Sequence, residues 1–126
     1  MVEFGYTHMS NTPSLVRLLN LMSAIRALSP FQKLNAEEEM LLDDLIIRWH
    51  NNVTLTVSDV INDTRYPSPT TAYRRLIALR EKGIIGLDVA SDDKRVKHIC
   101  PTKAALLYME TLGEGLEQLI SDARTA

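Results

Sequence analysis

Cysteine is almost absent from this sequence, since Cys100 is the only one among 126 residues. A single thiol excludes a disulfide within the chain and favours a reducing compartment, so we expect a cytoplasmic protein. Long hydrophobic runs are also missing. Residues 1–16 contain no Lys or Arg, and the apolar segment LVRLLNLMSAIRAL, which begins at Leu15, carries Arg17 and Arg26. This pattern excludes a secretory signal peptide and a membrane span over these residues.

The sequence also lacks the arrangements that most enzymes and metal sites need. It contains no nucleophile–base motif and no Gly-rich phosphate loop. The three histidines, His8, His50 and His98, lie far apart without a second cysteine or a local carboxylate pattern, so no metal site is expected. An enzyme and a bound cofactor are therefore not expected. Cys100 ends an apolar run, and we interpret it as a small buried hydrophobic residue rather than a redox sensor.

The composition is that of an ordinary globular protein, but its charge is unevenly distributed. Hydrophobic residues make up 45% and charged residues 24% of the chain, which predicts one domain spanning residues 1–126 with a real core. The net charge is −2, yet residues 65–103 hold nine basic and four acidic side chains, a net charge of +5. The rest of the chain carries −7. One region is basic and the remainder is acidic.

Two helices are predicted in the first half of the chain. Thr12 as N-cap and Pro13 after it predict a helix to about residue 28. Its apolar residues spread too widely around the helix for one contact surface, so two surfaces must cover it, and one of them can belong to a partner chain. Asn35 and Glu38 form a predicted capping box for a helix over about residues 36–49. We interpret the acidic run 37–39 as capping and solvated surface, and Met40 and Trp49 as core.

Two further helices follow, joined by a short turn. Thr56 and Asp59 predict a capping box and a helix over about residues 57–63, with an inner face of Val57, Val60, Ile61 and Thr64. Ser68 and Pro69 start the next helix, which runs to Lys82 and ends at Gly83. Its spacing places Ala72, Leu76 and Leu79 on the core side, Thr70, Thr71, Arg74 and Ala78 on the opposite side, and Tyr73 and Arg75 at the flanks.

The segments IIGLDVA and VKHIC, separated by the polar turn SDDKR, predict a β-hairpin, and Thr102 caps a last Leu-rich helix. The fold class is therefore mainly α with a small β-hairpin wing. We expect a winged helix-turn-helix core over about residues 34–101, flanked by terminal dimerisation helices over about residues 12–28 and 102–121.

The basic segment coincides with the second helix of the turn and with the hairpin, and this arrangement favours double-stranded DNA as the partner. Hydroxyls near the helix start and Arg74 suit a major groove, and Lys94 and Arg95 at the hairpin tip suit the backbone or a narrow minor groove, with Asp93 orienting Arg95. The predicted DNA-binding residues are Ser68, Thr70, Thr71, Tyr73, Arg74, Arg75, Lys94, Arg95 and Lys97.

The stretches LTVSDV, SPTTAYRRLIALREKGII and SDDKRVKHICPTKAA resemble, in order and spacing, the winged-helix core of the MarR family of bacterial transcription regulators, including the Asp-x-Arg of the wing at Asp93 and Arg95. The resemblance covers roughly residues 34–112. It implies a homodimer joined by its terminal helices that binds a pseudo-palindromic operator and is often released by a small-molecule effector.

Two other interpretations remain open at this point. The basic side chains of the helix and the hairpin can be a solvated face that binds nothing. The same helix and hairpin can also form a protein-interaction module that docks an acidic partner protein.

Overall fold

The computed structural model describes residues 10–51, 54–89 and 95–125. Within these residues the chain forms mainly helices and one antiparallel hairpin. The helices are α1 (Thr12–Arg26), the 3-10 turn η2 (Phe31–Lys33), α2 (Ala36–Asn51), α3 (Val57–Ile61), α4 (Pro69–Glu81) and α5 (Lys103–Thr125). The strands are β1 (Ile85–Val89) and β2 (Lys97–Pro101). This is the predicted fold class, a mainly helical chain with a β-hairpin wing.

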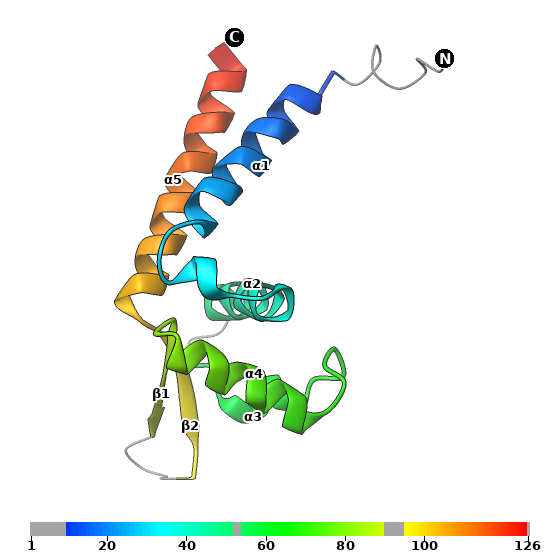
Figure 1. Ribbon diagram of the computed structural model, residues 1–126, viewed down its shortest axis with the longest axis vertical. Coiled ribbons are helices and arrows are strands. Elements are labelled where there is room, and N and C mark those ends of the chain that lie inside the picture. The colour runs from blue at the N-terminus through cyan, green and yellow to red at the C-terminus, as the bar shows by residue number, and fades with distance from the viewer. Residues whose placement is uncertain (1–9, 52–53, 90–94, 126) are drawn as a thin grey trace, which may run out of the picture.

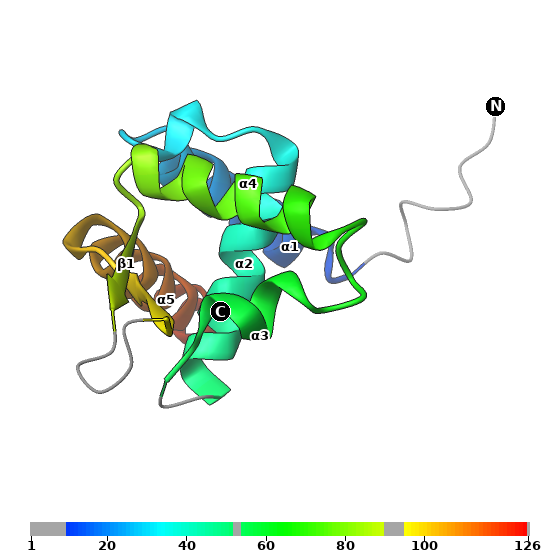
Figure 2. The ribbon, with the colours of Figure 1, turned by 90° about the horizontal axis from the view of Figure 1, so that it is seen from below.

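The molecule has two parts that differ in shape. Helices α1 and α5 lie side by side in opposite directions and rise together from a lobe formed by α2, α3, α4 and the hairpin (Figure 1). Helices α3 and α4 and the hairpin lie at the end of the molecule opposite the C-terminus of α5 (Figure 1), and this end faces the viewer when the molecule is seen from below (Figure 2). No helix among the described residues is both long and apolar enough to cross a membrane.

The helix starts follow local capping chemistry at three of the predicted positions. The Glu38 backbone N–H donates to Asn35 Oδ1 at 2.8 Å, and the Asn35 N–H donates to Glu38 Oε1 at 3.0 Å. The Thr56 and Asp59 capping box is also present, and Ser68 caps α4. These bonds satisfy donors that a helix start would otherwise leave unpaired.

Several boundaries differ from the prediction, among them the end of α5, which lies at Thr125 and not at about residue 121. The N-cap of α1 is Asn11 and not Thr12, and no side chain caps this helix. Helix α1 ends at Arg26, because the chain turns there into η2. Helix α3 ends at Ile61, so Thr64 lies in the following loop and is exposed instead of sharing the inner face of Val57 and Val60.

The core lies between α2, α3, α4, the hairpin and the start of α5. Its fully buried large side chains are Leu41, Leu42, Leu45, Val60, Leu76, Leu79, Ile84 and Ile85. Trp49 packs against this core and donates its indole N–H to the Ile99 carbonyl at 2.9 Å, as its partly apolar and partly polar ring requires. Met40 is 71% exposed, so its assignment to the core was wrong. It lies on the solvent face of α2. The spacing of apolar residues alone does not tell whether such a face is exposed or is buried by another element.

The wing and α5 are tied to the end of α4. Strand β1 pairs with β2 in the register Ile85 with Pro101 to Val89 with Lys97. Gly83 adopts φ 79° after α4, the left-handed conformation that glycine tolerates best. The Thr102 hydroxyl lies 2.7 Å from the Gly83 carbonyl and 2.9 Å from the Ile84 carbonyl, and Thr102 Oγ1 also accepts from the Ala105 N–H at 3.4 Å. Thr102 therefore caps α5 while it holds the exit of α4.

Helix α5 continues through both of its glycines, Gly113 and Gly115. The second one lies where α1 crosses, since a Cβ built on Gly115 would stand 2.8 Å from both δ carbons of Leu21. The lower end of α1 is anchored by Arg26, whose Nε donates to the Tyr108 hydroxyl at 3.1 Å and whose NH2 donates to Asp43 at 3.2 Å. This one side chain joins α1 to α2 and α5.

Candidate nucleic-acid interface

Helix α4 is held at its start by Ser68. The Ser68 hydroxyl accepts from the Thr71 N–H at 3.1 Å and lies 3.0 Å from Thr71 Oγ1, while Pro69 occupies the first turn. The Ser68 side chain, which is one of the predicted DNA-binding residues, is thus engaged in capping. Thr71 shares this cap, so its hydroxyl is also partly committed.

The inner side of α4 is buried as predicted, whereas only part of its predicted outer side is exposed. Ala72, Leu76 and Leu79 are completely buried, which confirms the predicted inner side. Thr70 and Arg74 are exposed. The other residues assigned to the outer side or its flanks are half-buried, namely Thr71, Tyr73, Arg75 and Ala78.

A shallow hollow of about 260 Å³ explains part of this difference. Thr71, Arg74, Arg75 and Ala78 line one side of it, and Asn35, Glu37 and Glu38 at the start of α2 line the other. Thr71 and Ala78 therefore face the start of α2 and not open solvent. The two arginines border both the hollow and the outer surface, and Tyr73 packs against the core.

Two basic side chains of the charged window are neutralised by carboxylates that lie outside it. Arg65 pairs with Asp44 of α2 and lies 3.9 Å from Asp63, and Lys82 pairs with Glu38 of α2. The net charge of +5 counted along the sequence thus overstates the positive charge that this face offers to an anion. The error has a physical cause, because the pairing partners are 21 and 44 residues away in the chain.

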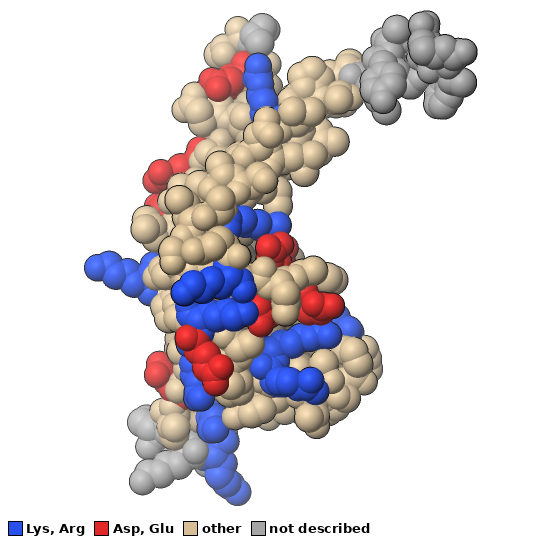
Figure 3. Space-filling model, viewed as in Figure 1, with Lys and Arg blue, Asp and Glu red and all other residues tan. Residues whose placement is uncertain are grey.

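The remaining basic residues leave a smaller positive surface. Within the described ranges, neither Arg74 nor Arg75 forms an ion pair within 4.0 Å. Lys97 is exposed at the outer end of β2, and Arg95 is exposed just before it. Lys and Arg side chains spread over the lobe with a few acidic ones among them, whereas the α1 and α5 pair is mostly uncharged in the same view (Figure 3).

Part of the predicted wing lies outside the described residues. Lys94 and Asp93 belong to the range 90–94, so their predicted roles, phosphate contact and orientation of Arg95, stay predictions. His8 lies outside as well. The structure therefore brings together Thr70, Arg74 and Arg75 on α4 and places Arg95 and Lys97 on the hairpin of the same lobe.

Buried carboxylates on α2 are features that the sequence reasoning missed. Glu38 was predicted to cap α2 and to be solvated; it does cap the helix, but it is only 5% exposed. Burial alone would raise the pKa of its carboxyl, and the Lys82 ammonium and the Asn35 N–H outweigh this effect, so the pKa is lowered. A capping-box residue followed by an apolar face is the only signal of this burial in the sequence.

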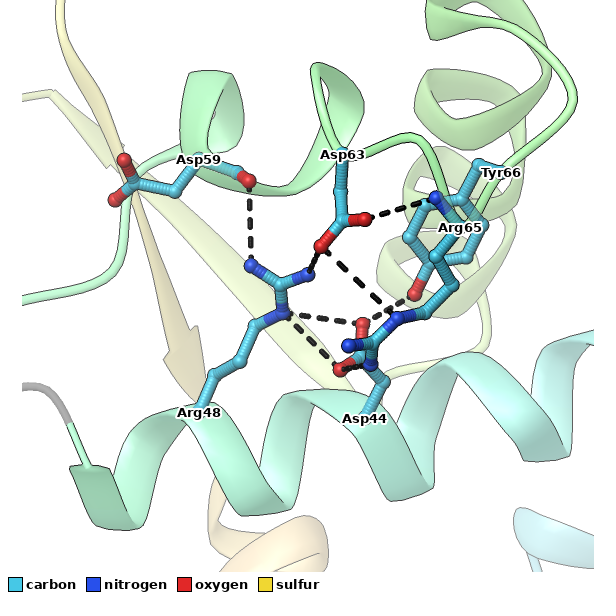
Figure 4. Close-up of polar contacts among 6 residues, drawn as sticks. All are labelled: Asp44, Arg48, Asp59, Asp63, Arg65 and Tyr66. Carbon is cyan, nitrogen blue, oxygen red and sulfur yellow. Dashed lines mark hydrogen bonds and ion pairs between the residues drawn. The ribbon is translucent and has the colours of Figure 1, made fainter.

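Asp44 is the second of these carboxylates and is 6% exposed. Arg48 Nε donates to both of its oxygens at 3.1 Å, and Arg65 and the Tyr66 hydroxyl also donate to it (Figure 4). Burial and the bond to Asp44 raise the pKa of Tyr66 above its ordinary value. The same Arg48 donates to the Asp59 carbonyl at 3.2 Å and to Asp63 (Figure 4).

Cys100 is half-buried rather than fully buried. Burial, a hydrogen bond to Asp88 and the negative charge of Asp88 raise the pKa of its thiol. The thiolate is therefore disfavoured, as expected for a residue that packs rather than reacts.

Comparisons with known proteins identify the fold. No protein-family model matches the chain, and no curated protein matches its sequence. The structure is similar to that of a mutant of MepR from S. aureus, with a TM-score of 0.58 and 19% sequence identity over 98% of this chain and 84% of that one. It is also similar to YusO from Bacillus subtilis, with a TM-score of 0.51 and 15% identity over 96% and 84% of the two chains. The expected MarR-like winged-helix fold is thereby confirmed.

Proposed function

We propose that this chain is a transcriptional regulator of the MarR type that binds a pseudo-palindromic DNA operator as a homodimer. The observation that carries the proposal is the exposed pair Thr70 and Arg74 on α4, with Arg74 outside every ion pair found among the described residues. A guanidinium at this place can donate two parallel hydrogen bonds to guanine O6 and N7 in a major groove. The fold supports the assignment, since α4 is the second helix of a helix-turn-helix.

Positive charge beside α4 supports the same partner. Arg75 flanks the helix, and Arg95 and Lys97 lie on the wing, where phosphates would follow the groove edge. Lys94, with Asp93 orienting Arg95, extends this set in the proposal. Arg65 and Lys82 are excluded from it because carboxylates already neutralise them. With three or four phosphate contacts per protomer, the slope of log K against log salt for a dimer is roughly −5 to −7.

The homodimer rests on apolar surface that α1 and α5 leave uncovered. Among the residues that the structure describes, eleven large hydrophobic residues are exposed, and eight of them belong to these helices or directly follow α1: Leu15, Val16, Leu19, Leu28, Leu106, Leu107, Leu116 and Ile120. Exposed large apolar side chains concentrated in this way on two packed helices indicate an interface in soluble proteins. A second copy of the same helix pair would cover it around a two-fold axis, which also matches the symmetry of an inverted-repeat operator.

For an effector, which the family resemblance implies, we propose a hollow at the base of the α1 and α5 pair. A mostly apolar hollow of about 130 Å³ lies between the end of α1, Phe31 and α5, next to Tyr108. This volume is well below the roughly 300 Å³ at which pockets for drug-sized ligands begin. The proposed effector is therefore a small apolar molecule with few heavy atoms.

The first test is selection of duplex DNA from a random pool, followed by titration of the selected duplex against salt. The proposal expects an enriched inverted repeat and a steep negative slope. Arg74→Ala should lower the preference for the selected duplex over a scrambled one roughly 5- to 150-fold for each half-site, the value of one bidentate base contact. If no sequence is enriched and binding stays weak at low salt, the operator proposal fails, and capture of an acidic protein partner becomes the next experiment.

The dimer is tested separately by sedimentation at micromolar concentration. Leu19→Glu places a charge on the proposed interface, at a side chain that is 54% exposed, and should yield a monomer. Met40→Glu is the matched control, because Met40 is equally apolar and more exposed but lies on α2. A wild-type monomer, or dissociation by both substitutions alike, contradicts the proposed interface.

A further inference from the structure

Helix α2 holds the proposed reading helix at both of its ends. Among the residues that the structure describes, two charged side chains are buried, Glu38 and Asp44, and both belong to α2. Glu38 pairs with Lys82, the C-cap of α4, and Asp44 pairs with Arg65, three residues before the N-cap Ser68. Glu38 thus reaches the end of α4, and Asp44 reaches the turn that leads into its start.

The contact at the start of α4 is a network that includes the whole preceding turn. Arg48 of α2 binds Asp44, the Asp59 carbonyl of α3 and Asp63 after α3. Asp63 in turn accepts from the Arg65 N–H at 2.8 Å, and this bond together with Arg48 lowers the pKa of Asp63. The side chains of Asp44, Arg48, Asp63, Arg65 and Tyr66 converge between α2 and the turn (Figure 4). Every bond in the network ends on α2, on the last turn of α3 or on the turn itself.

The contact at the end of α4 is smaller but equally specific. The Lys82 ammonium binds Glu38 and donates to the Lys33 carbonyl at 3.0 Å. Glu38 is held in place by the Asn35 capping box, so its carboxylate has a fixed direction. A buried charge that loses its partner is strongly destabilising, so a displacement of α4 that breaks either attachment would be costly.

We propose that Glu38 and Asp44 are positioning residues that fix α4 against α2 and so determine which base edges Thr70 and Arg74 reach. This inference rests on the proposed function, because it concerns how α4 reads DNA. Neither carboxylate touches DNA in the proposed mode. Their effect passes through Lys82 and through Arg65, Arg48 and Tyr66.

The test compares Glu38→Gln, Asp44→Asn and the control Asp43→Asn on the full chain. Asp43 lies on the same helix and is ion-paired, but its partner is Arg26 of α1. Affinity for the selected and the scrambled duplex is measured across salt concentrations. Glu38→Gln and Asp44→Asn should each lower the affinity ratio by roughly tenfold or more, because Arg74 loses its base contact, while the salt slope stays unchanged. Asp43→Asn should leave both quantities unchanged. An unchanged ratio in both test variants overturns the proposal.

Amide hydrogen exchange provides a readout that needs no DNA. Asp44→Asn should speed exchange over residues 62–72, and Glu38→Gln should speed it over residues 78–84, with no change in Asp43→Asn. If the wild type selects no DNA, the proposed function fails, and these exchange rates still decide whether α2 fixes α4. The positioning role is overturned if Glu38→Gln and Asp44→Asn exchange these amide hydrogens at the wild-type rates.

Milder variants cover the case in which Glu38→Gln or Asp44→Asn does not fold. Arg65→Met leaves Asp44 with Arg48 and Tyr66, and the double variant Glu38→Gln, Lys82→Met removes both charges of the other pair, so neither leaves a buried carboxylate without a cation. Both should lower the affinity ratio, whereas Arg65→Lys and Lys82→Arg should retain it. A fall in the salt slope of about 0.9 per protomer in Arg65→Met would make Arg65 a phosphate contact and contradict its positioning role.

Discussion

The two glycines of α5 should respond in opposite ways to the same substitution. Gly113 and Gly115 both lie inside a continuous helix, where replacing glycine with alanine contributes about 0.5–1 kcal/mol. A Cβ at Gly113 meets no atom within 4 Å, so Gly113→Ala should gain this full amount. At Gly115 the new Cβ would lie 2.8 Å from both δ carbons of Leu21 and 3.3 Å from its γ carbon.

The three short contacts decide whether Gly115→Ala stabilises or destabilises the protein. Rotation about the last Leu21 torsion can move one δ carbon away, but it leaves the other δ carbon and the γ carbon close to the new Cβ, so the side chain must change its first torsion or α1 must move away. Overpacking of this kind costs about 1–3 kcal/mol, which exceeds the helical gain. Gly115→Ala should therefore be about 1 kcal/mol less stable than the wild type, equivalent to about 4 °C in Tm for a chain of this size.

The assay is unfolding by urea followed by helical circular dichroism, with all variants at one protein concentration. Leu21→Ala removes the obstructing carbons, so Gly115→Ala should become stabilising in that background. A Gly115→Ala variant as stable as Gly113→Ala would refute the close packing of α1 on α5 on which this reasoning depends.

Three further outcomes follow from the local chemistry. The lowered pKa of Glu38 stabilises the folded state above about pH 4.5. The difference in unfolding free energy between the wild type and Glu38→Gln should therefore shrink as the pH falls through the pKa of Glu38 in the folded state. Urea unfolding repeated at a series of acidic pH values measures this difference. The raised pKa of Cys100 should make its alkylation at about pH 7.5 slower than that of an unfolded control peptide, and Asp88→Asn should speed it. Ser68→Ala should cost about 1 kcal/mol of stability through the lost cap, measured by urea unfolding, whereas Ser68→Asp should retain the cap.

The sequence predicted those parts of the structure that depend on neighbouring residues. The capping boxes at Asn35 and Thr56 and the start of α4 at Ser68 are local, because the bonding partners lie three residues apart. The buried stripe of Ala72, Leu76 and Leu79 follows from helical period alone. Local chemistry thus accounts for the element order and for the inner side of α4.

The rest depends on contacts between distant residues. Arg65 and Lys82 look like free positive charges in the sequence, and only the folded chain brings Asp44 and Glu38 to them. The exposure of Met40 could not be predicted either, because an apolar residue at helical spacing faces solvent when no other element covers it. The reading residues themselves, including Ser68, Thr70, Thr71, Tyr73, Arg74, Arg75, Lys94, Arg95 and Lys97, remain predictions until DNA binding is measured.

The attachment of Thr102 to the carbonyls of Gly83 and Ile84 gives the molecule a mechanical property. Thr102 joins the residues that follow α4 to the start of α5, so a tilt of α5 together with α1 about Thr102 would also change the angle at the base of the wing. A helix of 23 residues is about 34 Å long, and a tilt of about one degree at Thr102 moves its far end by about 0.6 Å. A shift of a few tenths of an ångström at the far end of α5, where two protomers would meet, therefore corresponds to a change of less than about one degree in the orientation of the wing.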